Sequence, residues 1–277
     1  MNALKTADDI WNFDLFVNGE KKGIITLHVP VVDICAWHNS RPSPFEVVLG
    51  IDRDQISRII YMQDGLDTKT GKIVPIAEEP DCLFGVYALS WLIDKAGLDN
   101  KLKNARSEER LCMAQLEFLM ADAEDGMELM DFDEDDIEPE TEPKYEPEDV
   151  TVLKRLLNAR RMIDAVMFLK ENTWKIKAIR VLPAQLRGIL QKAGNNMPYA
   201  TYDIRELYEK VIAQNGRLEK LSNLQAPDII IRNEILHLQK AVDSLYANDW
   251  LENPCTHIDD TPYMSITSAL NYGIARF

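Results

Sequence analysis

The acidic stretch MDFDEDD, residues 130–136, places Asp131, Asp133 and Asp135 at alternate positions. Carboxylates that converge on one tight turn can hold a magnesium ion, and glycine permits such a turn. Glu134 stands where that glycine would be, and Glu-Pro pairs follow. Because so polar a segment buries too little apolar surface to fold, we interpret 121–150 as a disordered acidic insert. A weak divalent-ion site is the alternative.

The other residues that could ligate a metal or act as nucleophiles show no catalytic spacing. No two cysteines form a C-x-x-C pair, so neither a zinc knuckle nor a disulfide framework is predicted. The four histidines lack ligand spacing as well, and no nucleophile–base arrangement is evident. We expect no catalytic residue, no metal site and no cofactor in this chain.

The net charge of −15 is concentrated in one segment. Residues 121–150 hold fifteen acids and one base, Lys144, so the other 247 residues carry about −1. A nucleic-acid partner is therefore not excluded by the acidic composition. No apolar run reaches the roughly 18 residues of a membrane span, and the first residues do not resemble a signal peptide. We expect a cytoplasmic protein.

The first half of the chain predicts a mixture of strands and helices. Residues 22–37 are rich in valine and isoleucine and contain Pro30, which predicts an edge or bulged strand. A loop over 39–45 follows. Asp52 is expected to cap a helix with Gln55 as its capping-box partner. A turn or hairpin is expected at 68–72, and further helices at about 83–95, 106–121 and 150–171. The last of these is expected to bury Leu153, Leu156, Leu157, Ile163, Val166 and Leu169 on one side.

The strongest periodicity lies between residues 203 and 247. Apolar residues recur at steps of three or four over 203–222, and at a strict 4-3-4-3 spacing over 229–247. Two such seams joined by a short turn predict an antiparallel helical hairpin. Two ordinary core helices are the alternative, but polar residues opposite the seam favour a hairpin that protrudes. The fold class is thus mainly α with a small β component.

The turn of this hairpin has the composition of a docking surface. It reads NLQAPDIIIRNE, residues 223–234. Pro227 is expected to end one helix, and Asp228 to cap the next. The three isoleucines offer an apolar anchor, and the Arg-Asn-Glu set offers a polar rim, which is the combination found in helix-docking surfaces.

These residues carry a resemblance to the β′ subunit of bacterial DNA-directed RNA polymerase. Residues 203–247 resemble the family's clamp helices, with APDII and RNE matched without a gap. The stretches GIITLHVPVVDICAW, FGVYALSWL, WKIKAIRVLPAQLRG, NNMPYATYD and SITSALNYGIARF are similar to further β′ segments. The resemblance covers nearly the whole chain apart from 1–20 and the acidic insert. The family's NADFDGD magnesium loop follows its clamp helices, so 130–136 is not that loop.

The resemblance implies site residues at the matching positions. The hairpin surface that docks a sigma-like factor corresponds to Gln214, Asn215, Arg217, Arg232, Asn233, Glu234 and Ala241. The lid, which lies against the RNA–DNA hybrid, and the switch segment near template DNA correspond to Arg187, Tyr199, Thr201 and Arg276. Factor binding is expected to weaken when Arg232 and Glu234 are replaced by alanine.

Several basic residues of the family are replaced here. Gln214 stands in place of an arginine, and Ile235-Leu236 in place of Lys-Arg. Asn271 and Ile274 replace lysines of the switch, and Met197 or Pro198 takes the place of the lid arginine. Each lost charge-assisted contact is typically worth about 1.5–3 kcal/mol. The resemblance thus implies a different initiation factor or weaker binding of DNA.

The resemblance implies a clamp, lid and sigma-docking part of β′, split from or a fragment of the subunit. It would belong to a nucleotidyltransferase whose Mg²⁺ is held by a companion chain, as in the split subunits of large-phage polymerases. Expected partners are β, the rest of β′, a sigma-like factor, template DNA and the hybrid. We expect five segments along the chain. They are an α+β part of the clamp at 1–120, the acidic insert at 121–150, a helix and the lid at 151–202, the clamp helices at 203–247 and the start of the switch at 248–277. The alternative is a free-standing β′ mimic that only binds an initiation factor.

Overall fold

The computed structural model describes residues 16–17, 20–21, 23–77, 81–128, 147–182 and 200–274. The described chain is mainly helical with three two-stranded sheets, which confirms the predicted fold class. It forms two compact units. The first comprises Met1–Arg41, Asp52–Ser90 and Thr173–Phe277, and the second Pro42–Ile51 and Trp91–Asn172. Each unit is assembled from segments that are distant along the chain.

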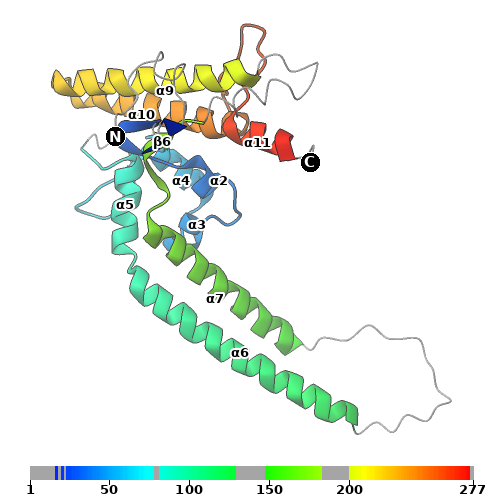
Figure 1. The fold of residues 1–277 in the computed structure, drawn as a ribbon. Coiled ribbons are helices and arrows are strands. Elements are labelled where there is room, and N and C mark those ends of the chain that lie inside the picture. Colours follow the sequence, from blue (N-terminus) through cyan, green and yellow to red (C-terminus); the bar gives the residue numbers. More distant parts are fainter. Residues whose placement is uncertain are drawn as a thin grey trace. The chain divides into compact units, whose positions relative to one another are not determined.

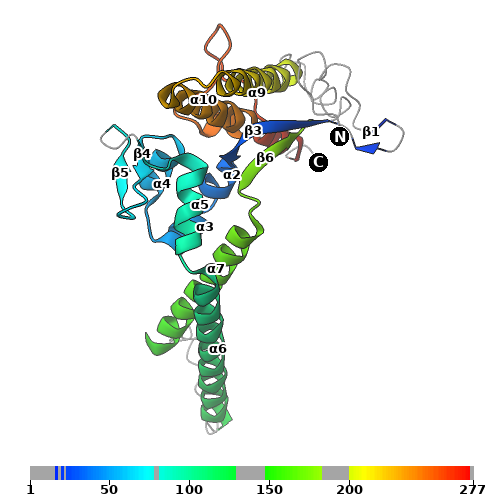
Figure 2. The same cartoon turned by 90° about the vertical axis from the view of Figure 1, so that its left-hand side faces the viewer.

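The central strands of the first unit are β3 (Ile24–Val32) and β6 (Lys175–Arg180), which pair antiparallel (Figure 2). Their register shifts between Thr26 and Val31, in the stretch that contains Pro30, a residue that has no N–H to donate. This irregularity agrees with the prediction of an edge or bulged strand. The predicted strand ends early. Residues Ile34–His38 form the short helix α2, because the Asp33 side chain accepts a hydrogen bond from the backbone N of Cys35 at 2.9 Å and caps it.

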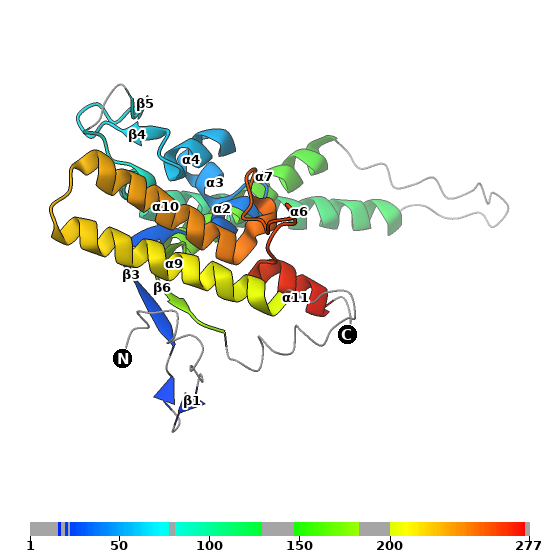
Figure 3. The ribbon, with the colours of Figure 1, turned by 90° about the horizontal axis from the view of Figure 1, so that it is seen from above.

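The helical hairpin is formed by α9 (Ala200–Asn223) and α10 (Asp228–Ala247), which pack along one another (Figures 1 and 3). At the turn, Gln225 adopts a left-handed φ of 53°. The N–H of Ala226 bonds the carbonyl of Leu221 and that of Gln225 bonds Ser222, which is a Schellman motif. The expected cap at Asp228 is wrong: Pro227 is the N-cap, without a side-chain hydrogen bond, and Asp228 lies in the first turn.

The hairpin packs into the core of its unit and does not stand free of it. Its seam and the inner faces of β3 and β6 share one apolar cluster, which includes Ile204, Tyr208, Val211, Leu238, Val242 and Leu245 with Ile25, Val31 and Ile179. Polar residues of α10 such as Gln239, Asp243 and Ser244 are buried too. The prediction of a protruding hairpin therefore holds for the tip and is wrong for the base, where the polar face is also covered.

Short elements complete the first unit. Helix α4 (Arg53–Ile60) is capped by Asp52, as predicted, because the Asp52 side chain accepts a hydrogen bond from the N–H of Gln55. This helix buries Ile56, Ile59 and Ile60. The expected hairpin near 68–72 joins β4 (Asp64–Leu66) to β5 (Ile73–Pro75). The remaining elements are β1 (Phe16–Val17), β2 (Glu20–Lys21), α5 (Gly85–Lys95, which extends into the second unit), η1 (Asn248–Trp250) and α11 (Ile266–Ile274).

The second unit is built on two long helices, α6 (Leu98–Glu128) and α7 (Pro147–Glu171), which pack side by side. The helix α3 (Pro44–Leu49) also belongs to it and carries a capping box between Ser43 and Glu46. This helix begins within the segment 39–45 that was expected to be a loop. Helices α6 and α7 extend into both ends of the predicted disordered insert, at 121–128 and 147–150. Residues 129–146 lie outside the described residues.

The apolar face of α7 is narrower than its sequence predicts. Leu156, Val166 and Leu169 are buried, but Leu153 and Leu157 are 40% and 52% exposed. Leu156 packs with Val152 and with Cys112 of α6 in a small cluster of their own. A two-helix layer covers one side of each helix only, which leaves apolar residues outside the shared seam exposed. Among the described residues, no helix combines the length and hydropathy needed to cross a membrane.

Candidate partner-binding site

The tip of the α9–α10 hairpin exposes apolar side chains. Leu224, Ile229 and Ile230 are 76%, 62% and 41% exposed. They lie on the turn and on the first turn of α10, at the end of the hairpin seen in Figure 3. Since contiguous exposed apolar side chains bordered by polar groups mark contact sites, this tip can bury a partner's apolar surface.

An ion pair across the two helices borders the tip. The Arg217 Nη2 atom on α9 lies 3.0 Å from the Glu234 Oε1 atom on α10. The Glu234 side chain is 4% exposed, whereas that of Arg217 is 64% exposed. The buried carboxylate therefore orients a guanidinium whose outer surface still faces solvent. Such a fixed, exposed arginine can donate hydrogen bonds to a carboxylate or carbonyl oxygen of a partner.

Arg232 and Asn233 follow on α10. The Arg232 guanidinium carbon lies 5.8 Å from the centroid of the Phe84 ring, at cation–π distance. Phe84 is absent from the residues predicted for the site, because its sequence segment gives no indication that it lies beside the hairpin. Asn233 is exposed. Arg232 is thus held in place by the body of the unit, and Asn233 is the more accessible of the two.

Two of the predicted contact residues make contacts within the fold. The Asn215 Oδ1 accepts from the backbone N of His28 at 2.7 Å, and its Nδ2 donates to the carbonyl of Thr26 at 3.0 Å. Ala241 is buried in the hairpin core. These positions match the family pattern, but in this structure the Asn215 amide bonds β3 and Ala241 packs inside.

Gln214 and the two apolar replacements beside the tip differ in exposure. The Gln214 Oε1 is buried and has no hydrogen-bond partner among the described residues. Ile235, which replaces a basic residue of the family pattern, is 7% exposed and packs in the core cluster. Leu236 is half-buried. The replacement at Ile235 therefore adds to the packing of the hairpin, whereas we expected it only to remove a surface charge.

The residues matched to the lid and switch are mostly outside the described part of the chain. The structure does not describe Arg187, Tyr199 and Arg276. The same holds for Asp131, Asp133 and Asp135 of the acidic stretch. Thr201 lies in the first turn of α9. Within the described ranges, no group of three or more His, Cys, Asp or Glu side chains is arranged to hold a metal ion.

A buried polar network at the base of the hairpin is not evident from the sequence. The Gln239 Oε1 accepts from the backbone N of Val32 at 2.8 Å, and its Nε2 donates to the Val32 carbonyl at 2.7 Å and to Asp243 Oδ1 at 2.9 Å. The Tyr61 hydroxyl donates to the other Asp243 oxygen at 3.1 Å. Burial raises the pKa of Asp243 to about 8. Helical periodicity predicts these polar positions to be exposed.

The fold and the tip together define a helical hairpin that is fixed to a small sheet and exposes apolar side chains at its turn. No family model matches the chain. The chain is similar to β′ subunits of DNA-directed RNA polymerase, as the motifs indicated. It is 27% identical to that of Salinibacter ruber over 272 residues, 29% to that of Opitutus terrae over 267 and 30% to that of Alkaliphilus metalliredigens over 266.

The similarity covers most of this chain and a small part of each relative. Each of these three matches includes 94% of the chain. The chain spans 18%, 18% and 21% of the three relatives' lengths. The predicted resemblance to β′ is therefore confirmed, and it is not restricted to the hairpin.

Proposed function

We propose that this chain acts in transcription as the clamp, lid and factor-docking part of a multisubunit DNA-directed RNA polymerase. Similarity to β′ over 94% of the chain carries this proposal. The rest of a β′ subunit would supply the magnesium-binding loop and the nucleotidyl transfer, and β would be a further partner. A protein that only mimicked the docking surface would need the hairpin alone, so the extent of the similarity favours the polymerase role.

The tip of the hairpin is the proposed docking surface for a helix of a sigma-like initiation factor. Leu224, Ile229 and Ile230 would supply the apolar anchor, since burying an exposed isoleucine is worth roughly 1.5–3 kcal/mol. Arg217, oriented by Glu234, and the adjacent Arg232 and Asn233 would set the direction of the bound helix. Asn215 and Ala241 would act indirectly, by fixing the hairpin.

The proposed contacts with nucleic acid rest on the family resemblance. Arg187, Tyr199 and Thr201 would face the RNA–DNA hybrid as part of a lid, and Arg276 would approach the template strand. Near-neutral charge outside 121–150 is compatible with such contacts.

Reconstitution tests the polymerase role. The chain is co-expressed with β, the rest of β′ and the initiation factor of its own source, and co-purification and promoter-directed RNA synthesis are measured. We expect all chains to co-purify and RNA to be made only when this chain is present. Binding to the factor without association with polymerase chains would instead establish the β′ mimic.

Substitutions at the tip test the docking surface. Ile229→Ala and Arg217→Ala are each expected to weaken factor binding about tenfold, the effect of a residue worth about 1.4 kcal/mol. Lys240→Ala, an exposed change farther along α10, is the matched control and should leave affinity within about twofold. Isothermal titration calorimetry gives the affinities. Equal affinities for the tip variants and the wild type would refute docking at the tip.

A further inference from the structure

A tight loop between α10 and α11 carries a fully exposed isoleucine. The loop spans residues 255–263, and Figures 1 and 2 show it, in orange-red, extending away from α9 and α10. The N–H of His257 bonds the carbonyl of Thr261 at 2.8 Å, which closes the tip of the loop. At that tip the Ile258 side chain is 106% exposed, more than any other large apolar side chain of the described residues.

The loop is held in place by its own unit. The buried Asn248 side chain joins the two ends of the loop, because its Nδ2 donates to the carbonyls of Cys255 and Tyr263, each at 2.9 Å. Its Oδ1 accepts from the N–H of Cys255 at 2.8 Å. The His257 Nε2 lies 2.9 Å from the Asp203 Oδ1 of α9. These bonds fix the backbone on both sides of the isoleucine, so the loop cannot turn this side chain inward without breaking them.

Two carboxylates follow this isoleucine directly. Asp259 and Asp260 are both exposed. The Asp259 Oδ1 accepts from the hydroxyl and the N–H of Thr261 at 2.6 and 3.2 Å, and these hydrogen bonds lower the pKa of Asp259. Residues 251–263 contain these two acids and Glu252 but no lysine or arginine. The tip therefore combines a fixed apolar side chain with negative charge.

The charge of the tip distinguishes between possible partners. The carboxylates would repel the phosphates of nucleic acids and anionic lipids. Two copies of the loop would repel one another in a symmetric contact. An apolar socket edged by lysine or arginine is complementary both to the isoleucine and to the carboxylates. A protein surface of this kind is therefore the partner that the tip fits.

We propose that the loop 255–263 docks this chain onto the rest of β′ by inserting Ile258 into an apolar socket edged with basic residues. The chain spans only 18% to 21% of its relatives' lengths, so a large part of a β′ subunit remains to contact it. Asp259 and Asp260 would pair with lysine or arginine at the edge of the socket. Because the loop is already fixed, it would lose little conformational entropy on binding. This inference rests on the proposed function, since it takes the rest of β′ as the partner.

Photo-cross-linking tests the proposed contact. The variant Ile258→benzoylphenylalanine of the full chain is co-expressed with β and the rest of β′, the purified complex is irradiated, and mass spectrometry locates the cross-link. We expect a cross-link to the rest of β′, at apolar residues next to lysine or arginine. Failure of the chains to co-purify would refute the proposed function and this inference with it. A complex that assembles with no cross-link from position 258, or with one only to nucleic acid or to a second copy, would overturn the inference alone.

Truncation of the isoleucine tests its contribution to affinity. Ile258→Ala is expected to weaken binding to the purified assembly of β and the rest of β′ about tenfold in biolayer interferometry. Because this side chain is fully exposed, its truncation removes no packing within the chain. Leu157→Ala, at a position 52% exposed in the second unit, is the control and should leave affinity within about twofold. Equal affinities of Ile258→Ala and the wild type would contradict the proposal.

Two aspartates with the same local bonding provide a matched pair for the charge. Asp259 and Asp67 each accept a hydrogen bond from a threonine hydroxyl, and this bond lowers the pKa of each carboxyl. Asp259→Asn should weaken binding and reduce its dependence on NaCl, since salt screens the pairing with a basic socket. Asp67→Asn, in the turn between β4 and β5, should change neither. Equal effects of the two substitutions would show that net charge, and not the loop, governs the association.

Discussion

At the scale of single residues, Asp243 is the least expected feature of this chain. It is fully buried, yet it accepts hydrogen bonds from Gln239 and Tyr61 rather than from a cation. Burial disfavours the charged carboxylate, which raises the pKa of Asp243 to about 8. The Cys35 thiol and Asp33, nearby groups that also interact with Asp243, have raised pKa values mainly through burial. Burial at the base of the hairpin therefore favours the protonated form of this acid.

The pH dependence of the free energy of unfolding should reveal the ionisation of Asp243. Its pKa is near 3.8 ordinarily and about 8 in the folded chain, so between these values the folded state holds a proton that the unfolded state has lost. The stability from this group is complete below pH 4 and declines as pH rises to 8. Asp243→Asn should remove that decline, so the variant gains unfolding free energy relative to wild type as pH rises. Urea unfolding at several pH values measures it.

The control for this experiment is Asp259→Asn. Hydrogen bonds from Thr261 lower the pKa of Asp259, an exposed carboxyl, so its titration lies below this pH window. Asp259→Asn should therefore keep the wild-type slope between pH 4 and 8. If Asp243→Asn shows the same slope as wild type, Asp243 is ionised in the folded state and the interpretation of the network is wrong.

At the scale of elements, two side-chain amides fasten the hairpin to the sheet. Asn215 on α9 bonds the backbone of β3 at Thr26 and His28, and Gln239 on α10 bonds it at Val32. An amide presents a donor and an acceptor side by side, as a neighbouring strand does, so each replaces a missing ladder partner for β3. The orientation of the hairpin is thus fixed by directional bonds from both of its helices as well as by apolar packing.

Removing these amides should cost stability in proportion to burial. Gln239→Ala leaves the buried N–H and C=O of Val32 unpaired, which we expect to lower the unfolding free energy by about 2–3 kcal/mol. Asn215→Ala, where water can replace the side chain, should cost about 1 kcal/mol. Gln214→Ala is the matched control with little expected loss, because the Gln214 carbonyl has no partner among the described residues. Urea unfolding curves give the unfolding free energy of each variant. A larger loss of unfolding free energy for Asn215→Ala than for Gln239→Ala would contradict this account.

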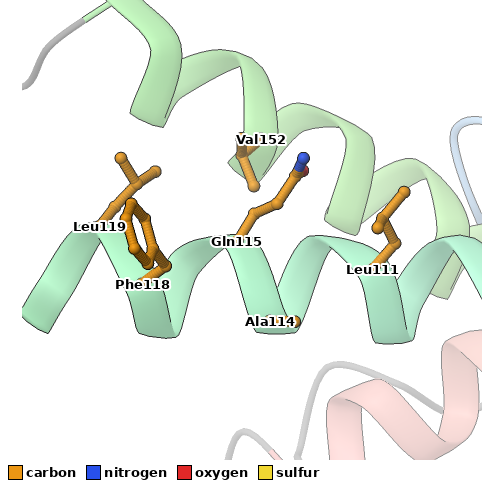
Figure 4. A pocket seen from close by; sticks show the side chains of 6 residues that line it. All are labelled: Leu111, Ala114, Gln115, Phe118, Leu119 and Val152. Atoms are coloured by element: carbon orange, nitrogen blue, oxygen red, sulfur yellow. The ribbon is translucent and has the colours of Figure 1, made fainter.

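At the scale of the whole molecule, the chain consists of two compact units. The hairpin tip and the loop 255–263 belong to the first unit. The second contains a groove of about 400 Å³ between α6 and α7, lined by Leu111, Ala114, Gln115, Phe118, Leu119 and Val152 (Figure 4). The small cluster of Cys112, Val152 and Leu156 holds these two helices together within their own unit. Perturbing one unit should therefore leave the local stability of the other largely unchanged.

Adjacent leucines on α7 test this independence. Leu156→Ala should destabilise the α6–α7 pair by about 2–3 kcal/mol, because it opens a cavity in a buried cluster. Leu157→Ala, at a position 52% exposed, is the matched control and should cost less than about 0.5 kcal/mol. Hydrogen exchange is expected to accelerate in α6 and α7 and to stay unchanged in α9 and α10. Faster exchange in all four helices would show that the units unfold together.

The sequence by itself determined the elements with strong local signals. Periodicity and backbone chemistry predict features that depend on neighbouring residues. These features are the apolar seams of 203–222 and 229–247, the cap of α4 at Asp52 and the irregular strand around Pro30. The motifs around the hairpin also sufficed to indicate the resemblance to β′. Composition predicted the small charge outside 121–150, but not that both ends of that insert continue as helices.

Only the tertiary structure decided which polar residues are free to meet a partner. Asn215, Glu234 and Gln239 all occupy polar positions on helices. Yet the Asn215 amide bonds β3, the Glu234 carboxylate orients Arg217, and the Gln239 amide joins a buried network. Periodicity identifies the apolar face of a helix but carries no information on what lies against its other side. That depends on contacts between residues about 190 to 210 positions apart along the chain, such as His28 with Asn215 and Val32 with Gln239, which form only when the sheet and the hairpin fold together.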